Sequence, residues 1–101
     1  MIGPADMSVK VGGTLQTHQQ LENVRDALKK ATLDAGGVFW DMYEAMGGKG
    51  SMITWVKSKP ALGSPDYIHF SQKGAEKISN IFYQSLMKEY DIYKLKKKIN
   101  S

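Results

Sequence analysis

The sequence predicts a protein of the α/β class, because a helical pattern is followed by a glycine turn and then by a short apolar segment typical of a buried strand. Between Thr17 and about Ala35, apolar residues recur at intervals of three and four, which places them on one helical face: Leu21, Val24, Leu28 and Ala31. We expect Thr17 to cap this helix and Gly36 to end it. The segment Val38–Tyr43 follows, rich in β-branched and aromatic residues, and is predicted to be a strand.

A second long helix is predicted from Ser71 to about Lys97, with Ser71 as its N-cap. Its apolar face comprises Ala75, Ile78, Ile81, Phe82, Ser85, Leu86, Tyr90 and Tyr93. Beyond Tyr90 the pattern weakens and residues 94–101 form a basic tail, which we expect to fray. Apolar faces this wide cannot both be covered by one or two strands, so we expect some apolar surface to remain exposed.

Two shorter segments contain glycine pairs. Val11–Thr17 is predicted to be a loop because it contains Gly12-Gly13. The second run, Gly47-Gly48-Lys49-Gly50-Ser51, matches neither a phosphate-binding loop nor a nucleophile elbow, because Lys49 precedes Gly50 and no G-x-S-x-G is present. It is therefore expected to be a turn in which Ser51 caps a short helix over Met52–Lys57.

Length and composition indicate one small globular unit of 101 residues, of which 42% are hydrophobic. No apolar run approaches the roughly 20 residues of a transmembrane helix, and Met1–Gly13 lacks the features of a signal peptide. The absence of cysteine excludes disulfides, thiolate zinc sites and a cysteine nucleophile. With only two histidines and no H-E-x-x-H, we expect no metal and no cofactor. The compartment is left open by the sequence itself.

The net charge of +4 comes from the lysines at the end of the chain, Lys94, Lys96, Lys97 and Lys98. Such a cluster is typical of a solvated helix C-terminus, where positive charge complements the helix dipole. Aromatic residues are not interleaved with the lysines as they are in proteins that bind single strands. We therefore expect no nucleic-acid partner.

The strongest chemical signal is the pair Asp66 and His69, which reads D-x-x-H directly before the second long helix. An acid three residues before a histidine can turn back and accept the imidazole Nδ1 proton, which leaves Nε2 free to act as a base. A surface turn followed by a capping serine is the alternative interpretation of the same residues. His18, in contrast, has no acid placed to orient it and is expected to be a surface residue.

The run D-Y-I-H-F-S-Q-K-G-A, together with the earlier F-W-D-M-Y-E-A-M-G-G-K-G-S-M-I-T-W-V, resembles the last third of SGNH (GDSL-type) hydrolases. Within that family the chain is similar to bacterial esterases that act as carbohydrate or peptidoglycan O-acetylesterases. The resemblance extends from Gly3 to about Tyr90. It implies that residues 1–101 are the C-terminal portion of a three-layer α/β/α, flavodoxin-like domain with parallel strands.

The resemblance also implies a site and a substrate. Asp66 and His69 correspond to the acid and the base of the family's catalytic triad, while Met46, Gly47 and Gly48 lie in the loop that shapes the substrate mouth. The implied substrate is an acylated carbohydrate or another ester, with O-acetyl groups on glycan as the main expectation. A secreted or periplasmic location is likewise implied by the family alone.

The nucleophile and the oxyanion donors of such an enzyme are missing from the sequence. No serine follows Gly-Asp, no G-x-N is present, and Asp6 cannot replace an oxyanion donor because an ionised carboxylate repels negative charge. We therefore expect an upstream segment of the same hydrolase, or self-association, to complete the chain, and the isolated 101 residues to be inactive. Two alternatives remain: a non-catalytic hydrolase-like module that binds glycan or a partner chain, and an interaction protein that uses its basic tail.

Overall fold

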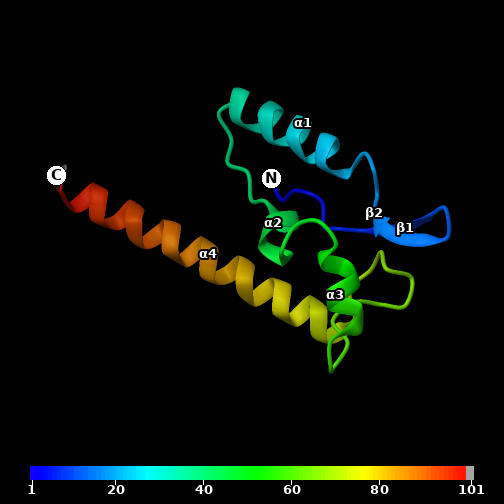
Figure 1. Ribbon diagram of the computed structural model, residues 1–101. Coiled ribbons are helices and arrows are strands. Elements are labelled where there is room, and N and C mark those ends of the chain that lie inside the picture. Colours follow the sequence, from blue (N-terminus) through cyan, green and yellow to red (C-terminus); the bar gives the residue numbers. More distant parts are fainter. Residues whose placement is uncertain (100–101) are drawn as a thin grey trace.

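The computed structural model describes residues 1–99, which form a mixed α/β structure with four helices and one small sheet (Figure 1). In chain order the elements are β1 (Ser8–Val11), β2 (Thr14–Thr17), α1 (Leu21–Asp34), α2 (Met42–Met46), α3 (Ser51–Lys57) and α4 (Gln72–Ile99). The sheet has two antiparallel strands. The α/β class is therefore as predicted, whereas a parallel flavodoxin-like sheet is not among the described elements.

The first correction concerns Val11–Thr17, which was predicted to be a loop but contributes to a hairpin. Ser8 pairs with Thr17 and Val11 pairs with Thr14, so only Gly12 and Gly13 form the turn. Both glycines have positive φ, 59° and 81°, as two-residue hairpin turns of the primed types require. The sequence signal was present, because a glycine pair between two segments of strand-forming residues is typical of a hairpin.

Helix α1 ends where the sequence predicted and begins later. Gly36 has φ of 81° and donates its backbone N–H to the carbonyl of Leu33, which confirms it as the stop. The predicted cap was wrong: Thr17 belongs to β2, and Gln20 is the N-cap without a side-chain hydrogen bond. Much of the predicted apolar face is uncovered, since Val24 is 46% exposed.

The predicted strand Val38–Tyr43 was also wrong. Only Trp40 pairs with another segment, through an isolated parallel bridge to Ile2. Directly afterwards Asp41 caps α2, and its Oδ1 accepts the backbone N–H of Glu44 at 3.0 Å. An acidic cap followed three residues later by Glu is a helix-start signal, and here it outweighs the apolar composition of the segment.

Helix α3 supplies two of the four residues of the main hydrophobic cluster, which are Met46, Met52, Trp55 and Ile78. Ser51 is the first residue of α3 and does not cap it, contrary to expectation. Gly50 is the N-cap, with a left-handed φ of 78°, and the carboxylate of Asp6 accepts the Met52 N–H at 2.8 Å. A residue 46 positions earlier in the sequence therefore caps α3.

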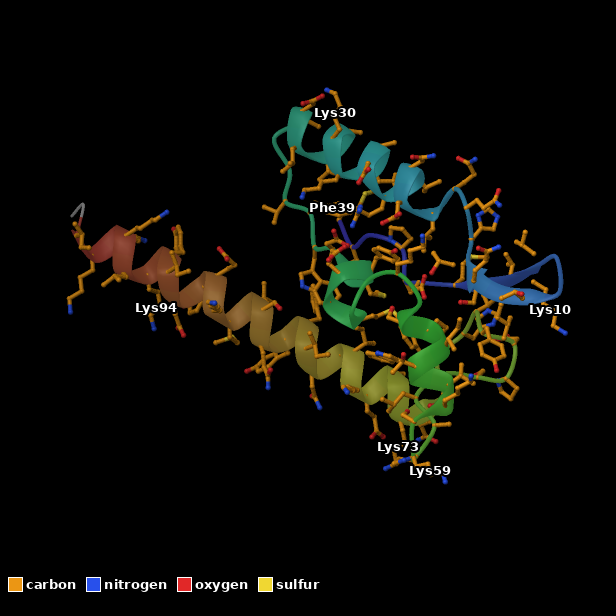
Figure 2. All side chains as sticks on the ribbon, in the orientation of Figure 1. Lys10, Lys30, Phe39, Lys59, Lys73 and Lys94 are labelled. Carbon is orange, nitrogen blue, oxygen red and sulfur yellow. The ribbon has the colours of Figure 1, made fainter. Side chains whose placement is uncertain are left out.

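Helix α4 is 28 residues long and only its first part packs on the body of the molecule. Ser71 accepts the backbone N–H of Gly74 at 3.1 Å, which confirms the predicted cap. Ile78 is buried, whereas residues 91–99 are exposed throughout. The helix continues through Ile99, so residues 94–99 of the predicted tail are helical and residues 100–101 lie outside the described part. Figure 2 shows Lys94 on the half of α4 that projects away from the other elements.

Candidate functional site

The pair Asp66 and His69 lies in a closed loop between α3 and α4. The loop is closed by an antiparallel bridge between Gly63 and Phe70. Inside it, Ser64 donates its N–H to the carbonyl of His69 at 2.8 Å, and its own carbonyl accepts the N–H of Tyr67 at 3.0 Å. These backbone hydrogen bonds make residues 64–69 a compact turn that holds the side chains of both Asp66 and His69.

The Asp66 carboxylate organises this turn through three contacts. Its Oδ1 accepts the backbone N–H groups of Ile68 at 2.9 Å and of His69 at 3.0 Å, and its Oδ2 lies 2.6 Å from His69 Nδ1. Tyr67, between them, has φ of 60°, a conformation that non-glycine residues rarely adopt. The predicted contact between acid and imidazole is therefore present, and a strained residue helps to make it.

The charge state of the pair follows from this geometry. The hydrogen bond from the His69 side chain, followed by the two backbone N–H groups, lowers the pKa of Asp66 to about 2. Because the carboxylate is ionised near neutral pH, the proton of the 2.6 Å contact is on Nδ1 and the lone pair of the neutral ring is on Nε2. The His69 side chain is 75% exposed, so Nε2 is open to a reacting group.

The loop is anchored to the rest of the molecule on two sides. Ser8, at the start of β1, donates its N–H to the Tyr67 carbonyl at 2.9 Å. Phe70 packs against Trp55 of the core, with the two ring centroids 5.4 Å apart. The Asp66 and His69 pair is therefore supported by both the hairpin and α3, although its own side chains are exposed.

The three residues assigned to a substrate mouth lie at the end of α2. Met46 is buried in the core, where its Sδ lies 3.4 Å from the Asp6 backbone N and its carbonyl accepts the Trp55 indole N–H at 3.0 Å. Gly47 is exposed and Gly48 is buried, and both have positive φ, 123° and 81°. Met46 thus packs in the interior, and a role of these three residues in substrate binding stays a prediction.

No serine within residues 1–99 forms a hydrogen bond with the imidazole. The hydroxyls of Ser71 and Ser64 donate hydrogen bonds to backbone carbonyls of their own loop, at 2.6 Å and 3.2 Å. Ser8 and Ser51 are buried, with hydroxyls that have no partner in this part of the chain. The other histidine, His18, accepts the N–H of Gln20 at 3.2 Å and contacts no carboxylate, as its sequence context suggested.

A buried polar cluster around Asp6 was not predicted. Asp6 is fully buried, and its Oδ1 accepts the hydroxyl proton of Thr17 at 2.9 Å, while its Oδ2 binds the N–H of Met52. The Thr17 hydroxyl in turn accepts the N–H of Gly50 at 2.8 Å. These contacts join the hairpin to α3. No local sequence pattern predicts these contacts, because the partners are 11 and 46 positions from Asp6.

Among residues 1–99 there is no group of three or more His, Asp or Glu side chains that could hold a metal ion. In the same part of the chain, none of the helices combines the length and the apolar character needed to cross a bilayer.

In comparisons with known proteins, no family model, no curated protein and no solved structure matches the chain.

Proposed function

We propose that Asp66 and His69 are the acid and the base of a serine esterase site of the SGNH type, whose nucleophile is supplied by another segment. The observation that carries the proposal is the 2.6 Å contact between Asp66 Oδ2 and His69 Nδ1, combined with an exposed imidazole. The proposed substrates are O-acyl esters, in particular O-acetyl groups on carbohydrate or glycan. This substrate class comes from the sequence resemblance.

The proposed mechanism assigns one role to each residue. His69 Nε2 accepts the proton of the attacking serine hydroxyl and later donates it to the oxygen of the leaving alcohol. Asp66 holds Nδ1–H in place and stabilises the imidazolium that forms between these two steps. Water then attacks the acyl-serine while His69 accepts its proton. His69 returns this proton to the serine oxygen, so that the carboxylic acid is released and the serine is restored.

The same proposal includes the finer description of the fold, a C-terminal portion of a three-layer α/β/α domain with parallel strands. The parallel bridge between Ile2 and Trp40 supports it, since it is the start of a parallel pair. In Figure 1 the segment that contains Ile2 passes between α1 and α4, as expected for a strand covered by helices on two faces. An upstream segment of the hydrolase, or a second copy, would supply the serine and the oxyanion donors.

The decisive experiment uses the complemented enzyme, made by co-expressing this chain with the segment upstream of it in its source genome. If that segment carries Gly-Asp-Ser, the pair should hydrolyse an aryl acetate that neither part hydrolyses alone. His69→Ala should then lower kcat by about 10³-fold or more with little change in KM.

His18→Ala is the matched control, because it removes the other histidine, and we expect its kcat to stay within about two-fold of the parent. An unchanged kcat in His69→Ala would show that the assignment is wrong. The assignment is also wrong if the source genome contains no complementing segment with a Gly-Asp-Ser motif.

A non-catalytic module that binds glycan is the second candidate, favoured by the lack of a serine in contact with His69 among residues 1–99. Titration of the isolated chain with acetylated and deacetylated oligosaccharides separates the two. Saturable binding without turnover supports the module, whereas a fragment of an enzyme should show neither.

A further inference from the structure

The contact between Asp66 and His69 is fixed by the backbone between the two residues and only slightly by burial. Their side chains are 46% and 75% exposed, so few neighbouring atoms restrain them. An exposed ion pair gains little from its own attraction, because each side chain loses rotamer freedom when the two meet. The 2.6 Å distance from Asp66 Oδ2 to His69 Nδ1 therefore depends on how residues 66–69 fold.

Tyr67 is the residue at which this segment turns. Its φ of 60° lies in the left-handed region, which is strained for a residue with a bulky side chain. The next two N–H groups, of Ile68 and His69, both donate to Asp66 Oδ1, at 2.9 Å and 3.0 Å. Rotation of Tyr67 to a common φ, about 120° away, would turn both groups from the carboxylate. The acid and the imidazole therefore meet because Tyr67 is left-handed.

Three parts of Tyr67 are held in place, each by a different part of the molecule. Its N–H donates to the Ser64 carbonyl at 3.0 Å, and its carbonyl accepts the N–H of Ser8, at the start of β1, at 2.9 Å. Its side chain packs, partly buried, against the main hydrophobic cluster, to which α2, α3 and α4 contribute. A rare backbone conformation persists when its surroundings determine it in this way.

We infer that Tyr67 is a positioning residue, whose ring and carbonyl transmit the packing of the core and of the hairpin to the Asp66 and His69 pair. Its importance for catalysis rests on the proposed function, whereas the positioning itself concerns a contact within this chain. The role belongs to the ring and the backbone, so the phenol hydroxyl is dispensable. Removal of the ring should therefore loosen the contact, and removal of the hydroxyl alone should not.

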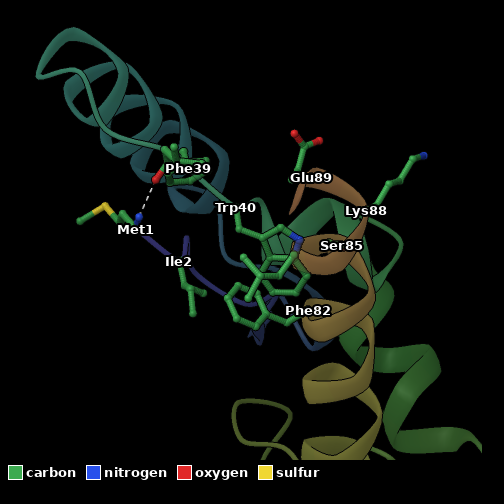
Figure 3. A pocket seen from close by; sticks show the side chains of 10 residues that line it. Met1, Ile2, Phe39, Trp40, Phe82, Ser85, Lys88 and Glu89 are labelled. Carbon is green, nitrogen blue, oxygen red and sulfur yellow. Dashed lines mark hydrogen bonds between the residues drawn. The ribbon is translucent and has the colours of Figure 1, made fainter. Parts of the chain in front are cut away.

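The apolar groove in Figure 3 provides a control for a general loss of packing. Its volume is about 730 Å³, and its lining includes Trp40 and Phe82 but none of residues 64–69. The Phe82 ring meets that of Trp40 edge to face, with centroids 5.0 Å apart. Phe82→Ala thus removes a packed aromatic ring at a place that the Asp66 and His69 loop does not line.

The test compares Tyr67→Gly, Tyr67→Phe and Phe82→Ala in the full chain. Glycine tolerates a φ of 60°, so Tyr67→Gly removes the ring without adding strain. By ¹³C titration, we expect this variant to raise the Asp66 midpoint by at least about one pH unit from the parent value of about 2. In ¹⁵N spectra, the proton of its neutral His69 ring should redistribute from Nδ1 toward Nε2. Tyr67→Phe and Phe82→Ala should keep the parent midpoint and tautomer.

In the complemented enzyme, Tyr67→Gly should lower kcat about ten-fold or more with little change in KM, because a misplaced base affects the reaction more than binding. Tyr67→Phe should turn over like the parent. The titrations use the isolated chain and need no nucleophile, so a failed complementation leaves the positioning role intact. Conversely, an unmoved midpoint would end the positioning role and leave the assignment of Asp66 and His69 untouched.

An Asp66 midpoint that stays near 2 in Tyr67→Gly, or that moves equally in Phe82→Ala, would overturn the inference. If Tyr67→Gly fails to fold, Ser8→Pro decides. It removes the N–H that holds the Tyr67 carbonyl, at the first residue of a strand, where proline is tolerated. The midpoint must rise in that variant as well. Fast hydrogen exchange of the Ser8 amide in the parent chain would overturn the inference by itself.

Discussion

The Asp66 carboxylate accepts hydrogen bonds from one side chain and two backbone groups within three residues of itself. Its pKa, about 2, lies below the roughly 3.9 of an aspartate in an unfolded chain. The contribution of the ionised Asp66 carboxylate to the free energy of unfolding is therefore complete above about pH 4 and is lost as the pH falls toward 2. A ¹³C titration of the Asp66 carboxyl should give a midpoint near 2.

His69→Ala should move that midpoint up toward about 4, because the imidazole is the largest cause of the lowered pKa. His18→Ala should leave it unchanged. A parent midpoint near 4 would mean that the contact between Asp66 and His69 does not persist in solution.

Asp6 is the residue on which the packing of the hairpin against α3 depends. Asp6→Ala leaves the Thr17 hydroxyl and the Met52 N–H buried without an acceptor, so the free energy of unfolding should fall by about 2–4 kcal/mol. Urea denaturation followed by circular dichroism measures this change. Asp34→Ala is the control, since Asp34 pairs with Lys30 on the surface and should cost no more than about 0.5 kcal/mol. Equal losses for the two variants would contradict the assigned role.

At the scale of elements, Gly74 sets how closely α4 approaches the segment that precedes the Asp66 and His69 loop. A Cβ at this position would lie 1.7 Å from the backbone carbonyl oxygen of Leu62. In Gly74→Ala, overpacking against this carbonyl should lower the free energy of unfolding by about 3 kcal/mol. The higher helix propensity of alanine should raise it by about 1 kcal/mol. We expect a net loss of about 2 kcal/mol in the free energy of unfolding, measured by urea denaturation.

Ser79→Ala is the matched control for Gly74, because Ser79 is exposed on the same helix. Ser79→Ala should change the free energy of unfolding by no more than about 0.5 kcal/mol. A stabilised Gly74→Ala variant would mean that α4 does not pack closely on Leu62.

At the scale of the whole molecule, the chain is elongated, with extents of 59 × 31 × 15 Å, because the last part of α4 leaves the body. Residues 91–99 are exposed, so burial contributes little to the stability of their helical backbone. Native-state hydrogen exchange should therefore be at least about ten-fold faster at amides 91–98 than at amides 76–82, after correction for intrinsic rates. Uniform protection along α4 would show that its end is covered in solution.

The sequence alone determined the features that depend on contacts within a few residues. The Gly36 stop, the Ser71 cap and the turn of Asp66 onto His69 all involve partners at most three positions apart, so residue type and spacing encode them. The hairpin turn and the start of α2 also depend on contacts within a few residues. Their sequence signals were present, but the first was interpreted as a loop and the second as a strand. Apolar composition cannot distinguish a buried strand from a helix start in so short a segment.

Only the tertiary structure decided which side chains meet across long sequence separations. Asp6 reaches Met52, Ile2 pairs with Trp40, and Met46 turns into the core, because burial of α3 and of the first part of α4 brings these residues together. Helical periodicity shows that a face is apolar, whereas the placement of the neighbouring elements decides whether that face is covered.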